Sequence, residues 1–169
     1  MPRAIRVLAA AERRDRAVVD TVLLDYTQRS SAENIAVTGV KGGAYEIALH
    51  EPARLRTDDL LVLDDGGLLE VVAAPEPLIE ARAADVAALS RLAWHLGDRH
   101  VPVQVLPNRI RARRDAVVEM LLVSLGAKTA MIEAPFEPEG GAYASTHEHG
   151  HAHHGHDHAH DHHGHDHDH

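Results

Sequence analysis

The sequence predicts an α+β protein with three parts. These are a small β-sandwich or barrel over residues 1–74, a ferredoxin-like βαββαβ domain over residues 75–145, and a disordered histidine-rich tail over residues 146–169. The first part consists of short, β-branched apolar runs. After it, the spacing of apolar residues switches between that of a strand and that of a helix. Beyond Thr146 no hydrophobic side chain is larger than alanine, so the tail cannot bury enough surface to fold alone.

Two patterns predict the strands of the first part. Some segments are short apolar runs, and others alternate apolar with polar residues, which is the period of a half-buried strand. The predicted strands lie within residues 17–24, 35–37, 45–49, 60–63 and 68–72. The last two flank Asp64-Asp65-Gly66-Gly67, a strong hairpin signal. Pro75 and Pro77 then resist helix and suit a stiff linker or the entry to a strand.

For the second part, residues 75–145, the residue pattern predicts two helices between four strands. The strands are expected within residues 79–83, 101–105, 109–113 and 129–133. Asp85 and Asp115 are candidate N-caps, and apolar residues at helical spacing follow each of them. Gly97 and Gly126 are the expected C-terminal stops. The order β-α-β-β-α-β is the split βαβ pattern, which hosts many functions and does not decide the chemistry.

Composition excludes several classes of function. The chain has 26 acidic and 17 basic residues, a formal charge of −9, which suits neither nucleic acid nor an anionic membrane. Arg109, Arg111, Arg113 and Arg114 lack interleaved aromatics, so a solvated face or a protein-partner surface is expected there. The absence of cysteine excludes disulfides, thiolate metal sites and cysteine nucleophiles. No catalytic or phosphate-binding motif appears, so we expect no enzyme. Apolar runs are too short for a signal peptide or a transmembrane helix, and the expected compartment is the cytoplasm.

The tail has the composition of a metal-binding segment. Thirteen of the 16 histidines lie within residues 147–169, mostly as His-X-His or His-His. Neutral imidazole and carboxylate suit Ni(II), Cu(II), Zn(II) or Co(II), and ligand type alone does not select nickel. Protons compete for the same nitrogens, so binding should weaken below about pH 6. A purification tag and a buffering or solubility tail are the alternative interpretations.

Three histidines lie outside the tail. His100 follows the first predicted helix; one imidazole cannot hold a metal tightly, but near a two-fold axis it would meet its own copy in a dimer. On spacing alone a surface or capping role is the more common one for such a residue. His95 is expected to be partly buried on the helix flank, and His50 to be structural or exposed. The candidate metal ligands are His100, His147, His149, His151, His153, His154, His156, His158, His160, His162, His163, His165, His167 and His169.

Two stretches and the tail resemble a known family. Residues 94–105, residues 135–143 and the histidine-rich end are similar to UreE, the urease accessory nickel metallochaperone family. The resemblance covers roughly residues 78–169, and the N-terminal part matches only by size and β character. The family's Gly-Asn-Arg-His motif stands here at residues 97–100, with Asp98 in place of the asparagine.

The resemblance implies a peptide-binding-like N-terminal domain and a ferredoxin-like domain that dimerises. In that family the two copies of the motif histidine, here His100, meet at the dimer interface and tail histidines complete the site. The resemblance also implies a homodimer that carries Ni(II) to apo-urease through the accessory GTPase complex. Zn(II) and Cu(II) are further metal ions that such a site is expected to bind. Some relatives have extra ligands where this chain has Arg114 and Ala116, so that auxiliary site is not expected here. Apolar residues near Trp94 and Leu96 are expected at the dimer seam.

Two other functions remain open on the sequence. One is a non-specific store for divalent metals, or a zinc-handling protein, on the same scaffold. The other is a folding chaperone or prolyl-isomerase-like module with an incidental tail, which the scarcity of aromatic residues disfavours. Retention of a tight metal site after truncation at Ser145 would distinguish a carrier from a store.

Overall fold

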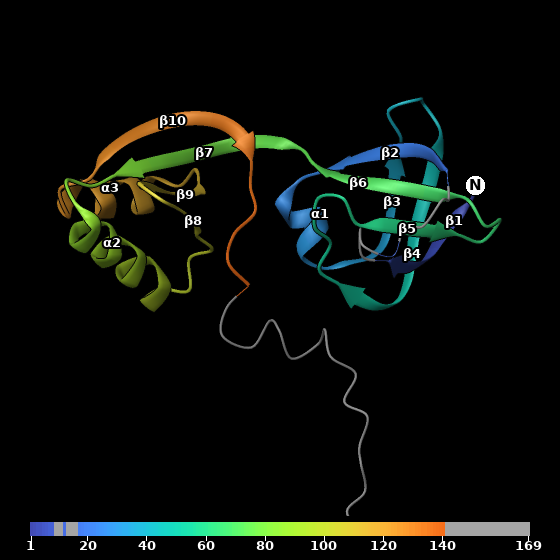
Figure 1. The fold of residues 1–169 in the computed structure, drawn as a ribbon, viewed down its shortest axis with the longest axis horizontal. Helices are drawn as coiled ribbons and strands as arrows, with labels where there is room; N and C mark the ends of the chain where they lie inside the picture. The colour runs from blue at the N-terminus through green and yellow to red at the C-terminus, as the bar shows by residue number, and fades with distance from the viewer. Residues whose placement is uncertain (9–11, 13–16, 141–169) are drawn as a thin grey trace, which may run out of the picture. The chain divides into compact units, whose positions relative to one another are not determined.

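The computed structural model describes residues 1–8, 12 and 17–140 (Figure 1). The described residues contain a six-stranded sheet, here sheet A, and a four-stranded sheet, sheet B, with three helices. This is the predicted α+β class. The tail lies outside the described residues, and the proposed domain boundaries stay a prediction.

Sheet A contains the strands of the N-terminal part. Its elements are β1 (Arg3–Leu8), β2 (Val18–Leu24), α1 (Tyr26–Ser30), β3 (Ala32–Thr38), β4 (Ala44–Ala53), β5 (Leu60–Leu63) and β6 (Leu68–Ala73). The strand order is β2-β6-β5-β1-β4-β3. The β1–β4 and β2–β6 pairs are parallel, and the predicted β5–β6 hairpin is confirmed, with Gly66 at φ 90° in its turn.

Sheet A is curled, because its edge strand β2 meets the turn between β3 and β4. Val22 forms a bridge with Gly39, and the Val40 N–H donates to the Thr21 carbonyl at 2.8 Å. The buried Asp20 carboxylate strengthens this junction by accepting the N–H groups of Thr21 and Lys41, at 2.8 and 3.0 Å. Burial would raise the pKa of Asp20, but these bonds and one from the Tyr45 hydroxyl hold it below its ordinary value.

One element of this part was not predicted. The sequence interpretation of residues 1–74 as entirely β was wrong at α1, a five-residue helix. Asp25 caps it by accepting the Gln28 N–H at 2.8 Å, and the Gln28 side chain accepts the Asp25 N–H at 3.0 Å. This reciprocal pair is a capping box, which stabilises a turn too short to show helical periodicity.

Sheet B confirms the predicted order β-α-β-β-α-β. Its elements are β7 (Pro75–Arg82), α2 (Val86–Asp98), β8 (Gln104–Leu106), β9 (Arg109–Arg113), α3 (Ala116–Ser124) and β10 (Lys128–Pro135). The strands are antiparallel in the order β10-β7-β9-β8. Only Ala74 separates β6 from β7, so the proline-rich segment is a strand entry. The strand expected over residues 101–105 is shorter, because β8 begins at Gln104.

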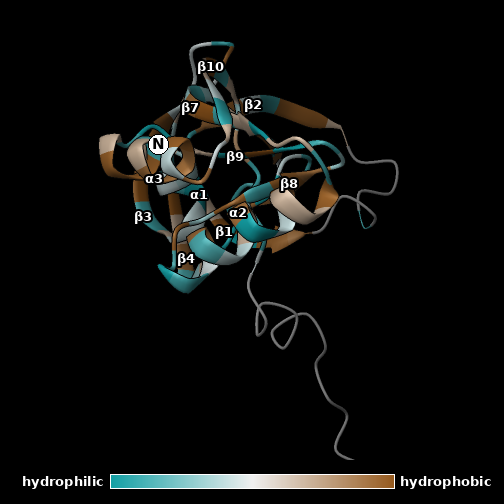
Figure 2. Cartoon of the chain, turned by 90° about the vertical axis from the view of Figure 1, so that its left-hand side faces the viewer, coloured by the Kyte–Doolittle hydropathy of each residue, from teal (hydrophilic) through white to brown (hydrophobic). Residues whose placement is uncertain are grey.

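The two longer helices cover one face of sheet B (Figure 1). Asp85 and Asp115 are the N-caps, as predicted. Leu89, Leu92 and Leu96 of α2 pack with the buried strand residues, and Figure 2 shows hydrophilic and hydrophobic residues alternating around this amphipathic helix. No helix among the described residues is long and apolar enough to cross a membrane.

Candidate functional site

His100 stands at the position that ends α2. The helix runs to Asp98, and His100 adopts a left-handed backbone with φ 55°. Its N–H donates to the Gly97 carbonyl at 2.9 Å, and the Val101 N–H donates to the Leu96 carbonyl at 3.0 Å. These two bonds form a Schellman motif, and Leu96 and Val101 belong to the same apolar cluster. The prediction that Gly97 stops the helix was wrong, because Gly97 lies inside α2.

The same motif ends α3 with a glycine. Gly126 has φ 83°, its N–H donates to Val123 at 2.9 Å, and the Ala127 N–H donates to Leu122 at 3.0 Å. Gly126 is therefore the predicted stop and the counterpart of His100. A β-carbon in the left-handed region is unfavourable, and such conformations concentrate at functional sites. The other described non-glycine residue with positive φ is Asp58, a type that tolerates this region through its short polar side chain.

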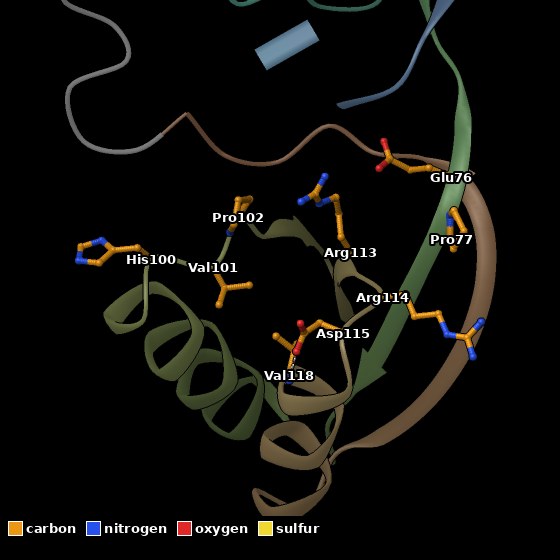
Figure 3. A pocket seen from close by; sticks show the side chains of 9 residues that line it. All are labelled: Glu76, Pro77, His100, Val101, Pro102, Arg113, Arg114, Asp115 and Val118. Atoms are coloured by element: carbon orange, nitrogen blue, oxygen red, sulfur yellow. Dashed lines mark hydrogen bonds between the residues drawn. The ribbon is translucent and has the colours of Figure 1, made fainter. Parts of the chain in front are cut away.

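The His100 side chain is exposed at the rim of an open depression of about 610 Å³. Figure 3 shows its ring pointing away from the other lining residues. The acids of the depression have structural partners: Glu76 accepts the Tyr26 N–H at 2.9 Å, and Asp115 accepts the N–H groups at the start of α3. Within the described ranges no three His, Cys, Asp or Glu side chains gather into a metal-binding group. His100 is the one histidine among the described residues that line this depression.

The histidines outside the tail differ in exposure. His95 is half-buried, as expected, and its ring contacts Trp94 edge-on at 4.9 Å between centroids. His50 is exposed on β4. Trp94 is 64% exposed and available for a contact, but Leu96 is fully buried in the core of sheet B. The dimer seam expected near Trp94 and Leu96 stays a prediction, and Leu96 itself belongs to the core of its own chain.

Sequence reasoning missed a strap, residues 136–139, that follows β10. Arg29 is 2% exposed, and its guanidinium donates to Glu137 Oε1 at 2.9 Å and to the Phe136 carbonyl at 2.6 Å. Phe136 is fully buried, with its ring edge-on to Tyr26 at 5.3 Å. One signal in the sequence could have revealed this contact: Phe136 is the only phenylalanine of the chain, and it stands in an otherwise polar segment.

The strap also returns the chain to the loop that carries His100. The Glu139 N–H donates to the Val103 carbonyl at 2.8 Å, three residues after His100. The thirteen predicted ligands from His147 to His169 lie outside the described residues. Their part in metal binding stays a prediction.

Fold and geometry together define an α+β protein with an exposed histidine, His100, whose backbone conformation is fixed by the motif that ends α2. The family model for the C-terminal domain of the UreE urease accessory protein matches residues 76–169. The chain belongs to the UreE family of urease accessory proteins, which assist urease maturation and are not catalysts.

Curated relatives support this assignment over most of the chain. A urease accessory protein UreE from Bradyrhizobium sp. (strain BTAi1 / ATCC BAA-1182) is 52% identical over 155 residues, which cover 91% of this chain and 74% of the relative. One from Rhodopseudomonas palustris (strain HaA2) is 52% identical over 134 residues, covering 79% and 61%. One from Chelativorans sp. (strain BNC1) is 42% identical over 150 residues, covering 89% and 94%.

Proposed function

We propose that this protein is a cytoplasmic, homodimeric nickel carrier that delivers Ni(II) to apo-urease through the accessory GTPase complex. The N-terminal part acts as a peptide-binding-like domain, and residues 75–145 form a ferredoxin-like domain that dimerises. His100 from each protomer holds the ion at the two-fold axis, and tail histidines complete its coordination. The metal is cargo, so the mechanism is ligand exchange.

The observation that carries the proposal is the backbone of His100. Two hydrogen bonds at the end of α2 fix this residue in a conformation that glycine would adopt more easily. The imidazole is thereby held outside the core at a defined place while its ring stays exposed. A rigid donor shared by two subunits provides geometry, and the remaining ligands can be labile.

The strap supports the role of the tail. Eight residues lead from Glu139, which is bound to Val103, to His147. A fully extended chain spans about 3.3 Å per residue, so His147 lies within roughly 26 Å of that anchor. Val103 is three residues from His100, so the tail's donors can reach the proposed interface site.

The mechanism then has three steps. Tail imidazoles capture Ni(II) and exchange it quickly, since no rigid cage holds them. The paired His100 side chains add two ordered nitrogens and hold the ion at the axis. A partner protein takes the ion by replacing these ligands one at a time. Because imidazole must be neutral to ligate, loading is expected to weaken below about pH 6.

The test is a nickel titration by calorimetry on four proteins: the native chain, His100→Ala, a truncation after Ser145, and the truncation with His100→Ala. A carrier keeps about one tight ion per dimer after truncation and loses it with His100→Ala. His50→Ala, which removes an exposed histidine on β4, is the matched control. If the truncated protein binds equally tightly with and without His100, the interface site is refuted. If truncation abolishes essentially all binding, the protein is a metal store.

A further inference from the structure

The face of sheet B opposite α2 and α3 carries an unusual set of charges. Along β7 and β9 the buried Ile79 and Ile110 belong to the core that the helices cover. The alternating residues occupy the other face, since successive side chains of a strand point to opposite sides. Lys128 of β10 is in register with Arg82, so these two share that face. We call Arg82, Arg109, Arg111 and Lys128 the cationic face.

One carboxylate organises three of these cations. Glu80 accepts from Arg111 Nε and from Arg82 Nη2, each at 3.0 Å, and Arg109 Nε lies 3.1 Å away. Burial would raise the pKa of Glu80, but these hydrogen bonds and positive charges lower it below its ordinary value. Glu80 therefore stays ionised and fixes the guanidinium groups in place. A single negative charge does not neutralise four positive ones, and this excess lies on a chain of formal charge −9.

Two features of the face are unfavourable in the isolated chain. Lys128 and Arg82 stand directly opposite each other on neighbouring strands, and like charges at that register repel. Gln104, which pairs with Arg111 across β8 and β9, has a buried side-chain oxygen without a hydrogen-bond partner among the described residues. Native structures seldom leave such an oxygen unsatisfied. The repelling pair Lys128 and Arg82 favours a partner that brings negative charge to this face.

We propose that the cationic face docks an acidic segment of a protein of the urease maturation machinery. This rests on the urease part of the proposed function and not on its metal site. Planar guanidinium groups held in fixed orientations match carboxylates with paired hydrogen bonds. Strands β7 to β10 contain no aromatic residue on which bases could stack, and the acidic chain repels an extended polyanion. A local acidic patch on a protein is therefore favoured over nucleic acid.

Lys128→Glu tests this without weakening the fold. The substitution turns a repulsive cross-strand pair with Arg82 into an attractive one, so thermal stability should not fall. The probe is purified apo-urease with its other accessory proteins, whose binding to the full-length chain is measured by biolayer interferometry over a salt series. We expect about fivefold weaker binding of Lys128→Glu at low salt, with the difference shrinking as salt screens the charges. Arg91→Glu, on the exposed side of α2, makes the same change of charge elsewhere and should bind normally.

Several results would overturn the proposal. These are unchanged binding of Lys128→Glu, an equal loss with Arg91→Glu, or a 12-residue single-stranded DNA that competes with the complex better than a 12-residue Glu/Asp peptide. The proposal also fails if removal of the acidic tail after Ser145 strengthens binding of the probe to the native face but not to the face of Lys128→Glu. The tail itself would then occupy the cationic face. Nickel titration of Lys128→Glu should match the native chain. If the native chain binds no member of the urease machinery, the proposed function itself fails.

Discussion

Replacing His100 with glycine should stabilise the metal-free protein while removing its proposed metal ligand. His100 has φ 55°, and Gly126 occupies the equivalent position of α3 with φ 83°. A β-carbon in this region costs about 1–2 kcal/mol. The greater freedom of glycine in the unfolded chain offsets about 0.5–1 kcal/mol of that gain. The expected net effect of His100→Gly is an increase of up to about 1.5 kcal/mol in the free energy of unfolding, or up to roughly 6 °C in Tm for a chain of this size.

Urea unfolding followed by far-UV circular dichroism, with a chelator present and at fixed protein concentration, measures this difference. His100→Ala keeps the β-carbon and should not gain stability, although it loses the same imidazole. Gly126→Ala is the reverse control: a β-carbon there meets no atom within 4 Å, so its cost of about 1 kcal/mol comes from backbone conformation alone. The reasoning is refuted if His100→Ala gains as much as His100→Gly, or if His100→Gly is the less stable of the two.

Three further substitutions test the strap and sheet B. Arg29→Met should lower the free energy of unfolding by about 2–4 kcal/mol, because Glu137 and several carbonyl groups lose their hydrogen-bond donor. Urea unfolding checks this, with Arg29→Lys as a milder variant. Lys128→Glu should raise stability by about 0.5 kcal/mol in low salt, and the gain should vanish in 1 M NaCl if its origin is the pair with Arg82. Glu80 has a pKa lowered from 4.5, so its stabilising effect is complete above that value and is lost as pH falls through the lowered pKa. Glu80→Gln should flatten the unfolding free energy over that acidic window, and an unchanged pH profile would contradict the assigned ion pairs.

Most of sheet B could be predicted because its signals are local. Asp85 and Asp115 stand immediately before apolar residues at helical spacing, and each caps the helix that follows. The topology of sheet A could not be predicted in the same way. The parallel pairs β1–β4 and β2–β6 join residues far apart in the chain, and no local pattern specifies which strands become neighbours. Helix α1 has five residues, which are too few to show the periodicity of a helix in the sequence.

The candidate site shows a different limit. Gly97 was taken as the helix stop because glycine usually fills the left-handed position, but here a histidine three residues later adopts that conformation. Side-chain burial was also hidden from the sequence. Arg29 is an ordinary surface residue by type, and it becomes a buried cross-link only through Glu137, more than a hundred residues away. Contacts at such separation follow from the packed fold and not from spacing.

At the end of α2 one residue both ends the helix and presents a polar side chain to solvent, although glycine usually takes the helix-ending position. In a Schellman motif the following residue, here Val101, packs back on the helix, while the left-handed residue projects beyond the helix end. A side chain at that place starts from a backbone held by two hydrogen bonds and takes no volume from the core. The Glu139–Val103 bond brings the chain back to this same loop just before the histidine-bearing segment begins. One loop therefore sets both the position of the imidazole and the starting point of the tail. This is why a residue disfavoured by the backbone can be worth keeping there.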